Sequence, residues 1–129
     1  MRALVADRSA TTRRVVIRAL RVVGVQDVLE FADLRGATAS LAGDPDIVIV
    51  EWTTIDDDAL QLITDLRARE GGATAKVIVM TERDRRPDLE RAIALGIQGY
   101  VLKPIETQVL VEQLAVALRP GESTAAEAA

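Results

Sequence analysis

Five short apolar runs alternate with amphipathic segments of helical length along this sequence, and this alternation restricts the fold more than any other feature. Several runs are continuous stretches of aliphatic residues, which is typical of strands covered on both faces. A strand followed by a helix five times predicts an α/β fold, with a five-stranded parallel sheet and helices on both faces. The predicted strands are Ala3–Ala6, Val28–Phe31, Ile47–Val50, Val77–Met80 and Gly99–Leu102.

The 129 residues correspond to one domain, which we expect to span residues 1–119. Residues 120–129 are small, polar and acidic, and they predict a disordered tail. No apolar run is long enough to span a membrane, and the N-terminus lacks the apolar stretch of a signal peptide. We therefore expect a cytoplasmic protein with no membrane partner.

Composition removes several kinds of active site. The sequence contains no cysteine and no histidine, which excludes a disulfide framework, a thiolate nucleophile, a zinc site and a histidine base. The net charge of -4 argues against a nucleic-acid platform, which usually carries a basic face. We therefore expect a chain that is not an enzyme, holds no cofactor and binds no nucleic acid.

Charged and hydroxyl side chains follow four of the five predicted strands. Because ligands of open parallel sheets bind beyond the carboxyl ends of the strands, we expect these side chains to converge on one crevice. In chain order they are Asp7 and Arg8, then Glu51, then Thr81 and Glu82, then Lys103.

The spacing of these residues resembles that of a response-regulator receiver domain of the single-domain chemotaxis type. Thr81 lies 30 residues after Glu51, and Lys103 lies 22 residues after Thr81 and precedes Pro104. Tyr100 stands three residues before that lysine, where the family keeps an aromatic switch residue. The resemblance covers residues 2 to about 118, and it implies a flavodoxin-like fold and a role in bacterial two-component signal transduction.

The family's chemistry uses two adjacent acids after the first strand and an aspartate after the third, which hold Mg²⁺ while that aspartate accepts a phosphoryl group. This sequence departs from the pattern at three positions. Arg8 stands at the second acid, Glu51 at the phosphoacceptor aspartate, and Glu82 where a small residue admits the phosphoryl group. We predict a degenerate phosphorylation pocket without metal, in which the guanidinium of Arg8 pairs with a carboxylate and replaces the ion.

The resemblance and these departures together predict a pseudo-receiver that signals by protein–protein interaction and without phosphorylation. The sequence leaves two states of the pocket open. In one, Glu51 mimics a phosphoryl group by pairing with Lys103 and Thr81; in the other, salt bridges hold a pocket that has no switch left. A receiver that still turns over phosphoryl groups poorly is an alternative function.

A further alternative is a sensor that binds a cyclic dinucleotide through its arginines. Residues Arg85 to Asp88 have the Arg-x-x-Asp spacing of such sites, and Arg83 adds a third arginine. The same residues are typical of a solvated helix start, which is the commoner origin of so short a motif. The run Asp56–Asp58 also indicates a helix start, because it lacks the glycine and the distal glutamate of a calcium loop.

The last predicted helix supplies a candidate partner surface. Its core positions leave Val109 and Val116 pointing away from the core, and apolar residues in such places often mark a docking site. The resemblance implies that a kinase, a regulator or an output protein docks on the face formed by the fourth helix, the fifth strand and the fifth helix. A homodimer through that face, and scattered surface apolar residues without a role, stay open as alternatives.

Overall fold

The aliphatic runs form five strands that pair in parallel, as predicted. The computed structural model describes residues 1–52, 58–82 and 86–119, and for 86–89 it describes the backbone alone. The strands lie in the order β2-β1-β3-β4-β5, and each begins and ends within one residue of its predicted bounds. They are β1 (Arg2–Ala6), β2 (Asp27–Phe31), β3 (Ile47–Glu51), β4 (Lys76–Thr81) and β5 (Gly99–Leu102).

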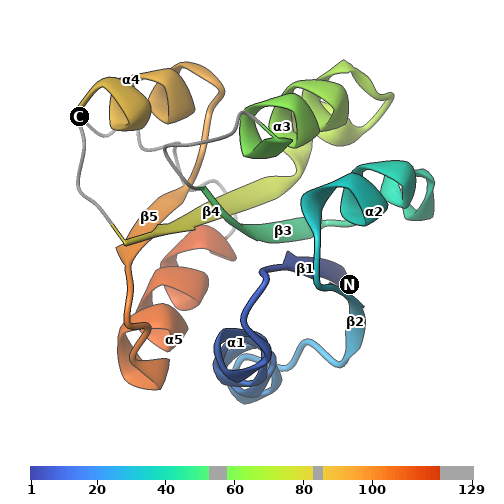
Figure 1. Cartoon of the computed structure of the whole chain (residues 1–129). Helices are drawn as coiled ribbons and strands as arrows, with labels where there is room; N and C mark the ends of the chain where they lie inside the picture. Colours follow the sequence, from blue (N-terminus) through green and yellow to red (C-terminus); the bar gives the residue numbers. More distant parts are fainter. Residues whose placement is uncertain (53–57, 83–85, 120–129) are drawn as a thin grey trace.

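Helices cover both faces of this sheet, with α1 and α5 on one face and α2, α3 and α4 on the other (Figure 1). Each face buries its own apolar cluster, so the sheet separates two hydrophobic cores. This arrangement is the predicted flavodoxin-like fold. The helices are α1 (Ala10–Val22), α2 (Leu34–Ala39), α3 (Asp58–Ala68), α4 (Arg86–Ala94) and α5 (Thr107–Ala117), with 3-10 turns η1 (Leu41–Gly43) and η2 (Gly72–Thr74).

Local sequence explains where α1 begins and ends. The Ser9 side chain accepts a hydrogen bond from the backbone N–H of Thr12 at 3.2 Å, which caps the first turn. The buried residues Val16, Ala19 and Leu20 then recur at helical spacing. Gly24 follows with a φ of +89°, a left-handed conformation that glycine adopts without strain and that reverses the chain toward β2.

The two central strands bring the first and third strand ends together. β1 and β3 are neighbours, and Ala6 pairs with Val50 in the register between them. The residues that follow, Asp7 and Glu51, therefore emerge side by side at the carboxyl edge of the sheet. The order of the strands thus explains why side chains 44 positions apart in sequence meet at one place.

The sequence also predicts a disordered tail and no membrane-spanning segment. The predicted tail, residues 120–129, lies outside the described residues. Among the residues that are described, no helix has the length and apolar character needed to cross a lipid bilayer.

Candidate functional site

Two carboxylates and one ammonium group meet at the carboxyl edge of the sheet. Asp7 is 1% exposed and Glu51 is 6% exposed, so both acids are buried. The Lys103 Nζ lies 2.7 Å from Asp7 Oδ2 and 3.0 Å from Glu51 Oε2. One lysine therefore bridges both acids, which is the arrangement that buried carboxylates require when they stay charged.

Arg8 completes the ion cluster from the outside. Its backbone N–H and its Nε–H both donate to Glu51 Oε1, at 2.9 and 2.8 Å. Its side chain is nevertheless 69% exposed, so the guanidinium lies at the mouth of the crevice. Arg8 thus pairs with a carboxylate from the rim, while Lys103 lies between the two acids.

The turn from β1 into α1 is held by the same residues. The second oxygen of Asp7, Oδ1, accepts a hydrogen bond from the backbone N–H of Ser9 at 2.8 Å. Arg13, from the second turn of α1, donates through Nη1 to the Asp7 carbonyl at 2.7 Å and pairs with Glu30 at 2.7 Å. These contacts fix Asp7 relative to β2 and α1, so its carboxylate cannot turn away from Lys103 without breaking them.

Electrostatics keeps both partners of the bridge charged. Burial raises the pKa of Glu51, but hydrogen bonds from the Arg8 backbone, the Arg8 guanidinium and Lys103 outweigh burial and leave that pKa below its ordinary value. Burial lowers the pKa of Lys103, while Asp7 and Glu51 raise it further, and the net pKa lies above its ordinary value. At neutral pH the formal charges of Asp7, Arg8, Glu51 and Lys103 cancel.

The other predicted pocket residues lie around this cluster in different ways. Thr81 is buried at the end of β4, and Tyr100 is half-buried on β5. Glu82 is exposed and forms no ion pair with the cluster. Of the five charged side chains that were expected to converge, four do so, and Glu82 is exposed to solvent instead.

The described residues do not fit the Mg²⁺ that the resemblance implies. Mg²⁺ requires oxygen ligands in near-octahedral geometry. Here a cavity of about 80 Å³ opens beside Asp7, Arg8, Glu51 and Asp58, but the two buried acids already share the ammonium of Lys103. Across residues 1–52, 58–82 and 86–119, no group of three acidic, histidine or cysteine side chains has the geometry of a metal site.

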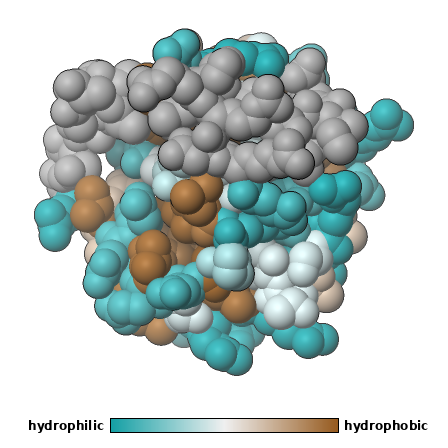
Figure 2. Space-filling model, turned by 60° about the vertical axis from the view of Figure 1, so that its left-hand side comes forward, coloured by the Kyte–Doolittle hydropathy of each residue, from teal (hydrophilic) through white to brown (hydrophobic). Residues whose placement is uncertain are grey.

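Apolar side chains gather on the side of the molecule formed by β5 and α5 (Figure 2). Val109 is 42% exposed and Val116 is 39% exposed, in agreement with their assignment away from the core. Sequence reasoning missed Leu102, which is 48% exposed at the end of β5. The sequence carries no clear signal for it, because Leu102 ends a continuous apolar run. A shallow groove of about 360 Å³ runs between Tyr100, Leu102 and Val109.

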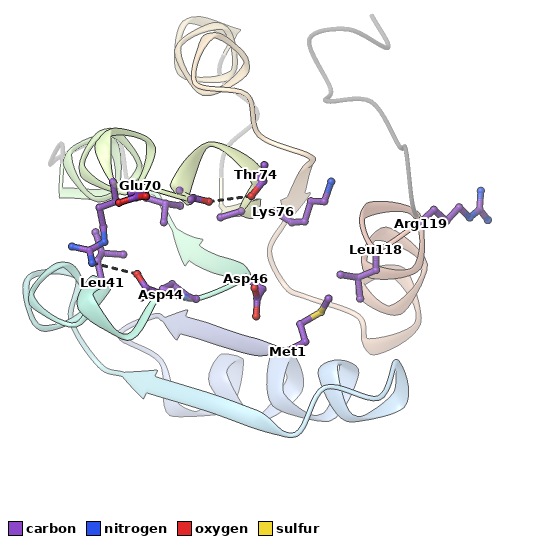
Figure 3. A pocket seen from close by; sticks show the side chains of 15 residues that line it. Met1, Leu41, Asp44, Asp46, Glu70, Thr74, Lys76, Leu118 and Arg119 are labelled. Atoms are coloured by element: carbon purple, nitrogen blue, oxygen red, sulfur yellow. Dashed lines mark hydrogen bonds and ion pairs between the residues drawn. The ribbon is translucent and has the colours of Figure 1, made fainter.

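A further cavity lies at the opposite, amino edge of the sheet and contains none of the predicted site residues (Figure 3). Its volume is about 570 Å³. Asp44 and Glu70 lie on one side of it, Lys76 and Leu118 on the other. Asp44 pairs with Arg69 at 3.3 Å at the rim, so part of this charge is already balanced.

Two sequence motifs fall partly or wholly outside the description. Arg83 and Arg85 are not described, nor are the side chains from Arg86 to Asp88, so the proposed dinucleotide motif lies outside the described residues. Of the acidic run Asp56–Asp58, only Asp58 is described. It begins α3, as the helix-start interpretation predicts.

Comparison with known proteins decides the family. The profile of the family described as "Response regulator receiver domain" matches residues 3–115. This chain belongs to that family. It is 31% identical over 120 residues to the chemotaxis protein CheY1 of Helicobacter pylori, covering 92% of this chain and 97% of that protein. It is 30% identical over 128 residues to the CheY homolog of Campylobacter jejuni, covering 98% of both.

Solved structures agree with the family at the level of the fold. The chemotaxis protein CheY4 of Vibrio cholerae superimposes with a TM-score of 0.79 at 21% identity, covering 91% of this chain and 98% of that one. A response regulator protein of Burkholderia multivorans gives a TM-score of 0.76 at 28% identity, covering 93% and 96%. The receiver is therefore a CheY-like signalling domain of the two-component type, as predicted.

Proposed function

We propose that this receiver, spanning residues 1–119, is a pseudo-receiver that signals through protein–protein contact and without phosphorylation. One observation supports the proposal above all others. Both oxygens of Glu51, at the end of β3, are engaged: Oε1 accepts two hydrogen bonds from Arg8, and Oε2 pairs with Lys103. In this proposal Glu51 occupies the position of the family's phosphoacceptor aspartate, so the departure from aspartate removes the acceptor.

The chemistry of phosphoryl transfer argues against activity at Glu51. The attacking carboxylate oxygen must be free and aligned with the leaving group, and misplacement by about 1 Å can lower the rate about 100-fold. Glu51 is one methylene longer than aspartate and is clamped at both oxygens. Lys103, which by family resemblance would meet the phosphoryl group, already binds Asp7 and Glu51. The domain therefore acts as a binding module rather than an enzyme.

A pocket whose ion pairs are already formed also lacks a ligand-driven switch between two conformations. A ligand shifts a conformational equilibrium only when it binds one state better than the other. Glu51 gives Lys103 a permanent anionic partner, so no added phosphoryl group distinguishes two states. We propose that the partner surface is presented constitutively.

The proposed partner surface is the face of α4, β5 and α5. Leu102, Val109 and Val116 supply exposed apolar area there. Trp52, next to Glu51, is buried beneath Arg91 of α4, with the guanidinium 5.8 Å from the ring centroid, so the pocket adjoins this face. The partner that we propose is a kinase, a regulator or an output protein.

The phosphorylation part of the proposal is tested with acetyl phosphate and Mg²⁺, followed by intact-mass spectrometry. The wild-type chain should gain no phosphoryl group. A double variant, Glu51→Asp with Arg8→Asp, restores both family acids and serves as the matched positive comparison. An adduct on the wild-type chain that maps to Glu51 would establish the alternative of a weakly phosphorylatable receiver.

The surface part is tested by placing a photo-crosslinking amino acid at position 109 in cells of the native host. Arg35, whose side chain is 89% exposed on α2, is the matched control position on another face. Adducts should form from position 109, and Val116→Glu should remove them while circular dichroism stays unchanged. Equal crosslinking from positions 35 and 109 would place the interface elsewhere.

A further inference from the structure

The exposed side of α1 carries a row of arginines that the fold does not use. Arg14, Arg18 and Arg21 follow one another at intervals of four and three residues, so they form one stripe along the helix. All three side chains are exposed. The helix contains no acidic residue at all, although the whole chain has a net charge of -4. Positive charge is therefore concentrated on this helix.

Other arginines of the chain show what a structural role looks like. Arg2 pairs with Asp27 at 3.0 Å, and Arg13, from α1 itself, pairs with Glu30 at 2.7 Å. In the described part of the chain, the three stripe arginines form no ion pair or hydrogen bond with a carboxylate. The neighbouring helix α5 offers Glu112, but its carboxylate accepts a hydrogen bond from Gln108 at 3.3 Å instead.

This arrangement has a cost within the fold, because like charges three or four residues apart on a helix repel each other. A guanidinium is an always-charged, planar donor whose fork matches a carboxylate. Seven residues of helix span roughly 10 Å, at about 1.5 Å per residue. Carboxylates at positions i, i+4 and i+7 of an opposing helix repeat over the same length and can meet all three arginines.

We propose that the Arg14–Arg18–Arg21 stripe is a docking site for an acidic helical segment of a protein partner. Val22, 64% exposed beside the stripe, adds an apolar contact that suits a protein surface. The three arginines cover only roughly 10 Å of helix, which suits a short acidic segment better than a long polyanion such as nucleic acid, whose binding grows with the number of phosphates neutralised. This site is distinct from the proposed partner surface on α4, β5 and α5 (the β5–α5 surface). Its test does not depend on the pseudo-receiver proposal.

The probe is a fluorescein-labelled, helix-forming peptide with glutamates at i, i+4 and i+7 and one adjacent leucine, measured by fluorescence anisotropy in about 0.15 M salt. The triple variant Arg14→Glu, Arg18→Glu, Arg21→Glu should weaken binding by at least about tenfold. The control triple variant Arg35→Glu, Arg69→Glu, Arg119→Glu changes the net charge equally at exposed sites elsewhere, and it should change binding by about twofold or less. Circular dichroism verifies the fold of both.

Three results would overturn the proposal. The first is equal loss of affinity in both triple variants. The second is equal binding of a peptide of identical composition whose glutamates are scrambled out of helical register. The third is stripe-dependent binding of duplex DNA or of phosphatidylserine vesicles that matches or exceeds binding of the acidic peptide. The variant Val109→Glu with Val116→Glu should bind the peptide like the wild type, which separates this site from the β5–α5 surface.

Discussion

Lys103 is the residue on which the charge balance of the pocket depends, because its ammonium is the partner of two buried carboxylates. Replacing Lys103 with Met keeps the length of the side chain but leaves Asp7 and Glu51 side by side with like charge. Removing one partner of a buried ion pair typically costs about 3–5 kcal/mol. We expect a loss of that size in the free energy of unfolding, measured with urea.

Lys76→Met is the matched control for that measurement. Lys76 is half-buried at the start of β4, and in the described residues its ammonium forms no ion pair with a carboxylate. Its replacement should change the free energy of unfolding by less than about 1 kcal/mol. A Lys103→Met variant as stable as this control would mean that the pocket acids do not depend on the lysine.

Glu51 gives the protein a dependence on acid pH whose sign follows from its lowered pKa. A group with a folded-state pKa below its unfolded value stabilises the fold above the unfolded value, and that contribution is lost as the pH falls through the folded pKa. The wild type should therefore exceed Glu51→Gln in stability most at neutral pH. The difference should shrink below pH 4.5, the ordinary value for this group. Urea unfolding at several pH values checks this, with Glu90→Gln as an exposed control.

At this scale the sequence predicts which residues meet but not how. Asp7, Glu51 and Lys103 could be grouped because residues that follow parallel strands share one edge of the sheet. That Lys103 bridges both acids, while Arg8 stays at the rim, depends on side-chain rotamers and on where each strand ends. Spacing carries no information on either, so the sequence predicts a carboxylate partner for Arg8 but not the position of Lys103 between the acids.

Among the elements, the end of α3 depends on a single side chain. Arg67 donates to four backbone carbonyls: Gly72 at 2.8 Å, Ala75 at 2.7 Å, Leu95 at 2.9 Å and Gly96 at 2.9 Å. These acceptors belong to η2, the approach to β4 and the turn after α4. Burial lowers the pKa of this guanidinium, and its hydrogen-bond acceptors are neutral carbonyl oxygens rather than a carboxylate. The sequence shows only an arginine in the last turn of a helix.

Arg67→Ala should leave these carbonyls without a donor and reduce the free energy of unfolding by about 2–3 kcal/mol, since hydrogen bonds to charged donors contribute more than neutral ones. Hydrogen exchange should quicken in residues 92–98, where α4 ends. Arg69→Ala is the neighbouring control: Arg69 pairs with Asp44 near solvent, and its loss should cost less than about 1 kcal/mol. Equal effects of the two substitutions would contradict a role in fixing α4.

For the whole molecule, five alternations of strand and helix were enough to predict the sheet, its direction and its two covered faces. Connections between parallel strands are right-handed. In the sheet that the chain forms, β1 and β3 lie side by side near the centre. The exposed part of the molecule was less predictable. The pattern of α5 assigned Val109 and Val116 to the surface, but Leu102 lies in a short strand at the edge of the sheet, where a continuous apolar run conceals which residues face solvent.

The stability of the whole molecule in the presence of Mg²⁺ tests the state of the pocket without reference to any partner. A ligand that binds only the folded state stabilises it by RT ln(1 + [L]/Kd), about 1.4 kcal/mol at a tenfold excess over Kd. Lys103 already neutralises Asp7 and Glu51. The wild-type melting temperature should therefore be the same in about 10 mM Mg²⁺ as in NaCl of equal ionic strength.

Arg8→Asp adds a third acid at the mouth of the pocket, so that variant should melt lower than the wild type in NaCl and regain several degrees with Mg²⁺. Arg35→Asp, an equal charge change at a side chain that is 89% exposed on α2, should show no such recovery. A rise in the wild-type melting temperature that saturates with Mg²⁺ would mean that the ion displaces the lysine, and the pocket would then keep the metal site of a working receiver.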